Sequence, residues 1–276
     1  HQLTVHPKPT SDFFEAANTT FKAVMPRGLD GCDQLIVEYT VKNNDSSDLS
    51  FNCMPSHFCT NINTMIGDDN FETTSDTEQW LAQVPYQDHQ QIERHETARY
   101  LDPTTYKVGS AGAALTIVAG ATTKLSHEMR NAFTQCRIPT KGVSDEVSFE
   151  FHSQLASTIV TNATDVDLLD VKVYAREKRR LKQQLDSAIS SNLDWRYLEP
   201  KIEEHKVELT SGQTMDKFLT NFSDNDLASH VWVLFRTNSL DGSAKDNYLS
   251  NVVSTLWFED NDGNTLTNGI NWTSTD

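Results

Sequence analysis

The stretch from residue 131 to residue 180 decides the fold, and it reads NAFTQCRIPTKGVSDEVSFEFHSQLASTIVTNATDVDLLDVKVYAREKRR. Two segments of it alternate apolar and polar residues with a period of two. The apolar positions are Val147, Phe149 and Phe151 in the first segment, and Leu169, Val171 and Val173 in the second. This alternation predicts strands with one buried and one solvated face, which are typical of antiparallel sheets. We therefore expect a β unit that ends near Tyr174.

The order of segments in this stretch resembles one known family. Phe133 and the segment Cys136–Thr140 precede a Glu-Val-x-Phe-Glu-Phe strand, and Ala156–Val160, an Asp-Val-x-Leu strand and an Arg/Lys-rich run follow it. This order and spacing resemble the first barrel of the double jelly-roll major capsid proteins of tailless, membrane-containing DNA viruses, bacteriophages in particular. The resemblance implies a mainly β chain with two jelly-roll barrels, helical insertions and a linker helix.

The rest of the chain can be divided on this plan. We predict an N-terminal arm over residues 1–18, a first barrel over 19–175 with a helical insertion near 70–100, a linker helix over 176–192 and a second barrel over 193–276. After the linker, Lys206–Leu209 and Val231–Asn238 repeat the short strand, turn and long apolar strand of the first half. The residues that follow Lys206 are too few for all the strands of a jelly roll, so we expect the second barrel to be incomplete.

Other segments show their own patterns. Strands are expected at Thr19–Val24 and Gln34–Lys42, and Phe51–Ile66 is expected to continue the sheet. Asn70–Tyr100 and Lys124–Phe133 are expected to be helical at least in part. The predicted core positions are Val37, Tyr39, Phe149, Phe151, Val171, Val173, Trp232 and Phe235.

The charge of the chain limits its partners. A net charge of −16 argues against a nucleic-acid partner held by neutralised phosphates. The basic run from Arg176 to Lys182 is either a solvated helix face or a contact with an acidic neighbouring subunit, which makes Arg179 and Arg180 candidate assembly residues. Phe13 and Phe14 are either a foot that docks on a neighbour or on a membrane, or a local anchor on their own barrel.

The sequence contains few residue patterns that point to catalysis or metal binding. The sequence lacks a Gly-x-Ser-x-Gly motif, a phosphate-binding glycine loop and a cupin-type His-x-His set, so we predict no enzyme activity and no cofactor. Asp260, Asp262 and Asn264 resemble the start of a calcium loop, but Gly263 comes too early and a β-turn is the alternative. The four cysteines are expected to be free thiols.

The resemblance also implies a function. It implies a major capsid protein whose pseudo-hexameric homotrimers tile the icosahedral shell of a virion. Its partners would be other copies and neighbouring capsomers, an internal viral membrane, and minor capsid or penton proteins. The chain would be found in the virion capsid, and in the host cytoplasm before assembly. The alternative is a carbohydrate-binding β-sandwich of a viral spike or adhesin, in which Trp195, Trp257 and Trp272 stack on sugars or instead pack in a core.

Overall fold

The structure is a computed structural model, and it divides the chain into two units. It describes residues 1–6, 11–14, 19–51, 53, 55–76, 78–79, 116–160 and 165–190, with short pieces at 255–256, 264 and 270–271. One unit comprises His1–Ile202 with Leu240–Asp246, and the other comprises Glu203–Ser239 with Asn247–Asp276. The first unit contains the two main sheets, and the described strands of the second are a single short antiparallel pair.

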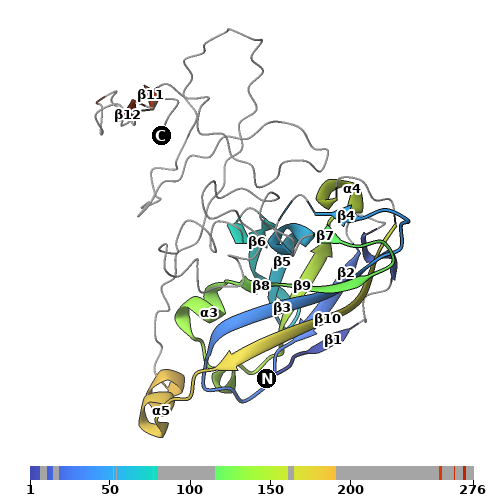
Figure 1. The fold of residues 1–276 in the computed structure, drawn as a ribbon. Helices are drawn as coiled ribbons and strands as arrows, with labels where there is room; N and C mark the ends of the chain where they lie inside the picture. Colours follow the sequence, from blue (N-terminus) through green and yellow to red (C-terminus); the bar gives the residue numbers. More distant parts are fainter. Residues whose placement is uncertain are drawn as a thin grey trace. The chain divides into compact units, whose positions relative to one another are not determined.

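The larger sheet of the first unit has five antiparallel strands. In order across the sheet they are β1 (Thr4–His6), β2 (Thr20–Val24), β9 (Val147–Ser153), β5 (Cys59–Ile66) and β6 (Asp69–Ser75). The central strand β9 pairs on both sides, so that Phe149 lies opposite Ala23 of β2 and Thr64 of β5. The predicted strand with alternating Phe residues is therefore the middle of a sheet (Figure 1).

The second sheet has three antiparallel strands. Its order is β10 (Val166–Glu177), β3 (Cys32–Asn43) and β8 (Thr122–Met129). Tyr39 in the middle of β3 lies opposite Val171 of β10 and Leu125 of β8. Along β3 the period-two apolar side chains are completely buried, and their polar neighbours are only partly covered. This is the pattern of a strand with one face on the core and the other toward solvent.

Short elements lie between and after the strands of the two sheets. They are η1 (Ser11–Phe14), β4 (Leu49–Ser50), η2 (Pro55–Phe58), β7 (Thr116–Ile117), α3 (Ala132–Cys136), η5 (Thr140–Gly142), α4 (Ala156–Ile159) and α5 (Lys182–Ser190), and β11 (Thr255–Leu256) pairs with β12 (Ile270–Asn271) in the second unit. None of the helices in the described ranges is long and apolar enough to cross a membrane.

Aromatic side chains from both sheets meet in the core. Phe21 of β2 stacks on Phe151 of β9, with ring centroids 4.5 Å apart and planes at 11°. Tyr39 of the three-stranded sheet contacts Phe58 at 5.2 Å, and its hydroxyl lies 3.6 Å from Cys59 Sγ of the five-stranded sheet. The two sheets therefore face each other across an apolar core, which is the arrangement of a jelly-roll unit.

The predicted mainly β class is confirmed in the described residues. Six of the predicted core positions are buried between the sheets: Val37, Tyr39, Phe149, Phe151, Val171 and Val173. The other two, Trp232 and Phe235, lie outside the described residues, as does most of the predicted second barrel.

The N-terminal residues correct the prediction of an arm that is not part of the barrel. The backbone of His1 and Leu3 hydrogen-bonds to Ala175 and Val173 of β10, with Leu3 N 2.8 Å from Val173 O. The following residues form β1 on the edge of β2 in the other sheet. This segment therefore joins an edge of each sheet, and it can do so because Leu3 enters the core and leaves only a few per cent of its surface exposed.

Phe13 and Phe14 also require a correction, because neither ring is exposed at all. Phe13 packs on Phe21 with ring centroids 5.4 Å apart, and Phe14 packs edge-on against Phe58 with centroids 5.7 Å apart. A side chain with no exposed surface offers nothing to a neighbouring subunit or a membrane. The structure therefore places this pair as an anchor in its own core and contradicts the docking alternative.

Two segments predicted as helical contain strands. Asp69–Ser75 forms β6 because Gly67, at a φ of 62°, allows a tight turn after β5. The amphipathic pattern predicted for the rest of the insertion begins at Trp80 and lies outside the described residues. Residues 124–129 belong to β8, in which Leu125 and Met129 are buried at alternate positions on either side of a buried histidine.

The linker prediction is also wrong in its bounds. Strand β10 continues to Glu177, and the helix α5 begins only at Lys182. A register shift between Leu168 and Asp170 turns Leu169 outward, so that it is 48% exposed and Leu168 takes the core position. A bulge of this kind displaces the period-two pattern by one residue, so the sequence pattern predicts the wrong face for Leu169.

Candidate functional site

Strand β3 begins and β10 ends at the same end of the three-stranded sheet, close to α3 and α5 (Figure 1). Seven of the described cations belong to the segments at this end, and six of them lie near Asp30 or Asp33. We call this surface the basic end. It consists of Arg137, Lys141, Arg176, Lys178, Arg179, Arg180 and Lys182. The whole chain carries a net charge of −16, so this is a local reversal of its sign.

Asp30 fixes the centre of the basic end. Its carboxylate forms an ion pair with Lys141 and accepts a hydrogen bond of 3.1 Å from the backbone N–H of Arg180. The hydrogen bond from Lys141, followed by that from Arg180, lowers the pKa of Asp30. The Arg180 guanidinium donates to the Arg137 carbonyl at 2.8 Å. These contacts hold the loop after β2, the segment after α3 and the segment after β10 together.

Two further acidic residues pair with cations at the edge of this surface. Asp33 accepts a hydrogen bond of 2.8 Å from Arg176, which lowers the pKa of Asp33 and raises that of Arg176. Glu177 lies 3.7 Å from Arg179, whose side chain is 88% exposed. Exposed pairs of this kind contribute little to folding and leave the cations accessible to a partner.

The structure treats the two predicted assembly residues differently. Arg180 is engaged inside its own unit by Asp30 and by the Arg137 carbonyl, so its proposed role in contacting a neighbour is not supported by its geometry. Arg179 projects into solvent, and the exposed Lys178 forms no ion pair with a described carboxylate. The sequence did not point to Arg137 and Lys141, because only the fold brings them beside the basic run after β10.

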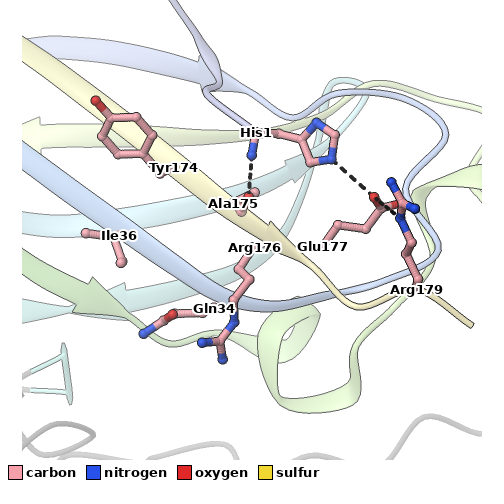
Figure 2. Close-up of a pocket in the computed structure, with 8 residues that line it drawn as sticks. All are labelled: His1, Gln34, Ile36, Tyr174, Ala175, Arg176, Glu177 and Arg179. Carbon is pink, nitrogen blue, oxygen red and sulfur yellow. Dashed lines mark hydrogen bonds and ion pairs between the residues drawn. The ribbon is translucent and has the colours of Figure 1, made fainter.

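An open depression of about 500 Å³ adjoins the basic end on the outer side of β3 and β10 (Figure 2). Its lining residues are His1, Gln34, Ile36, Tyr174, Ala175, Arg176, Glu177 and Arg179. His1 contributes to it through hydrogen bonds with the Ala175 carbonyl at 2.8 Å and the Glu177 carboxylate at 3.2 Å. The depression extends the basic end over the face of the sheet, because Arg176 and Arg179 belong to both.

A substitution at Gly31 tests whether the basic end is packed as described. A Cβ at this position would lie 2.7 Å from the Arg137 carbonyl oxygen, which is backbone and cannot turn away. We expect Gly31→Ala to lower the free energy of unfolding by roughly 1–3 kcal/mol, as is usual for overpacking. Urea denaturation measures this, with Gly142→Ala as the milder control, since its Cβ would meet only the Ile189 side chain at 3.3 Å. Equal stability of Gly31→Ala and the unmodified protein would contradict the close contact.

Other candidate sites from the sequence have little structural support. Within the described residues, no three His, Cys, Asp or Glu side chains are arranged to hold a metal ion. Of the predicted calcium loop only Asn264 is described, and Trp195, Trp257 and Trp272 lie outside the described residues. All four cysteines are free, as expected, and Cys136 alone is only partly buried.

Comparison with known proteins gives structural matches only. No protein-family model and no curated protein sequence matches the chain. The matching solved structures include the quasi-atomic model of the PBCV-1 virus capsid, at 11% identity and a TM-score of 0.45, over 68% of this chain and 43% of that one. PBCV-1 VP54, fitted into a reconstruction of the virophage Sputnik, matches at 10% identity and a TM-score of 0.46, over 69% and 44%.

A third match is the STIV MCP, at 13% identity and a TM-score of 0.39, over 67% of this chain and 50% of that one. Identities of 10–13% and TM-scores below 0.5 are too low to transfer a function to this chain. The chain spans about half the length of the proteins it matches, or less.

Proposed function

We propose that the chain is a structural subunit of a viral capsid, with no enzymatic role, and that it acts by binding other copies of itself. The observation that carries the proposal is the division of the chain into two units. The first unit contains two facing antiparallel sheets, and the same chain contains a second unit, Glu203–Ser239 with Asn247–Asp276. With two units per chain, three chains contribute six units to a ring, which is how a trimer can fill a hexagonal position in a shell.

The basic end supplies a contact for this assembly. Copies with a net charge of −16 repel one another, and a local cluster of exposed cations can offset that repulsion where it meets acidic surface. Each copy also offers acidic surface, for example at Asp48 and Asp165 in the loops at the opposite end of the three-stranded sheet. We therefore propose that the basic end binds an acidic surface of a neighbouring copy.

The finer features belong to this proposal as well. A homotrimer as the building block, a bacteriophage source, an internal viral membrane and minor capsid or penton proteins as partners follow from the family resemblance in the sequence. The host cytoplasm before assembly follows from the same resemblance.

Charge reversal at the basic end is expected to weaken self-association. The variant Lys178→Glu/Arg179→Glu/Lys182→Glu replaces three exposed cations and keeps the Lys141 ion pair and the Arg180 hydrogen bond of Asp30. Surface ion pairs are worth roughly 0.2–1 kcal/mol each, so we expect the dissociation constant at low salt to rise by about tenfold or more. Sedimentation velocity at low and high salt measures it.

The matched control reverses three lysines elsewhere on the three-stranded sheet and changes the net charge equally. It is Lys42→Glu/Lys124→Glu/Lys172→Glu. If both variants weaken association to the same degree, net charge and not the basic end is responsible. A chain that never associates would instead contradict the capsid proposal itself.

A further inference from the structure

A histidine in the core of the first unit has no role in the assembly described above. His127 lies in β8 with its side chain on the core side of the sheet and only 4% of its surface exposed. Neither of its ring nitrogens has a hydrogen-bond partner in the described residues. A buried polar side chain without partners is rare in folded proteins and needs a physical or functional explanation.

The groups around His127 offer no counter-charge. Its ring stacks on Tyr39 of β3, with centroids 5.8 Å apart and planes at 13°. The Tyr39 hydroxyl contacts Cys59 Sγ of β5, and burial raises the pKa of both groups, that of Cys59 to about 12, so both stay neutral. The apolar and aromatic surroundings therefore suit a neutral imidazole.

A second buried histidine makes a positive charge on His127 still less favourable. His57 in η2 has no exposed surface, and its Nδ1 lies 3.1 Å from the Asp76 carboxylate. The Asp76 carboxylate, which also acts on Cys59, is paired with His57. Repulsion from His57 adds to burial, and together they lower the pKa of His127 to about 3, with burial as the larger cause.

We propose that His127 is an acid-sensitive switch that opens the β8 side of the sandwich when the pH falls below neutral. In the closed sandwich the imidazole can be neutral but has no acceptor for a second N–H. Opening exposes the ring to water, where it takes up a proton. The proton comes from solvent, and no covalent bond other than this N–H forms or breaks.

The sign of the effect follows from the two protonation states. The closed form keeps His127 neutral down to about pH 3, whereas an exposed histidine has a pKa near 6.5. Between these values the open form binds one more proton than the closed form. Each pH unit below about 6.5 therefore favours opening by about tenfold, and the effect is absent above that pH.

This inference is independent of the capsid proposal, because it concerns opening within one chain. For a shell subunit it would mean a particle that is stable at neutral pH and loosens in an acidic compartment.

Amide hydrogen exchange of the 122–129 segment tests the switch in the complete chain. After correction for the intrinsic exchange rates, the opening constant of the unmodified protein should rise about 50-fold more between pH 6.5 and 4.5 than that of His127→Phe. Phenylalanine keeps a ring on Tyr39 but cannot be protonated. The control is His6→Phe at an exposed position in β1, which should keep the full pH dependence. Equal pH dependence of His127→Phe and the unmodified protein would overturn the proposal.

A second measurement covers the case in which His127→Phe does not fold. NMR titration of the imidazole protons in the unmodified protein should show His127 neutral for as long as the native signals of β8 persist. Reversible protonation of His127 near pH 6.5, with the native signals unchanged, would overturn the proposal without any variant.

Discussion

Replacing Phe149 with aspartate is expected to unfold the first unit at neutral pH. Phe149 has no exposed surface, and it lies in the middle of β9, between β2 and β5. Truncating a buried Phe typically costs about 3–5 kcal/mol, and a buried carboxylate without a partner adds several more. That sum is comparable with the whole stability of an ordinary domain, which is about 5–15 kcal/mol. Circular dichroism and amide exchange of the sheet segments would report the loss.

The adjacent residue provides the control for Phe149→Asp. Glu150 lies on the outer face of the same strand, where its carboxylate pairs with His152 at 2.9 Å. Glu150→Ala removes an outward side chain and should change the free energy of unfolding by less than about 1 kcal/mol. A Phe149→Asp variant that unfolds at the same denaturant concentration as Glu150→Ala would show that the buried face of β9 is assigned wrongly.

The second large effect is expected at the N-terminus, where Phe13→Ala/Phe14→Ala should strongly destabilise the first unit. Both rings are completely buried, and they pack on Phe21 and Phe58. Each truncation should cost roughly 3–5 kcal/mol, although the two costs need not add because the rings touch at 5.2 Å. Urea denaturation measures the loss, with Thr4→Ala at an exposed position of β1 as the control.

This outcome separates the two interpretations that the sequence left open for the pair. An anchor in the core predicts lower stability in isolated chains, whatever their state of assembly. A docking foot predicts unchanged stability and weaker assembly. An unfolding midpoint equal to that of Thr4→Ala would contradict the packing of η1 described above.

The sequence predicted the central strands because their patterns are local. Period-two alternation of apolar residues, from Leu35 to Val41 in β3 and from Val147 to Phe151 in β9, reflects burial of one face, although Ser148 of β9 is buried as well. The same signal failed in β8, because His127 occupies a core position and a histidine there does not look apolar. It failed at Leu169 because a bulge shifts the register, and a bulge depends on the partner strand.

Long-range features could not be obtained from sequence patterns. The first residues look like a polar arm with two prolines, and only the positions of β10 and β2 show that they join two sheet edges. Arg137 and Lys141 join the basic end from a separate stretch, held by Arg180 and Asp30. The basic run itself was visible in the sequence, but which of its cations are engaged within the unit was not.

The most direct test of the central claim is the mass of the purified chain in solution. Sedimentation equilibrium at tens of micromolar and moderate salt should show a concentration-dependent species of three times the 31.1 kDa chain mass. That result would support a trimeric building block of a shell. A single species of 31.1 kDa at every concentration and salt tested would contradict the account of this chain as a self-assembling capsid subunit.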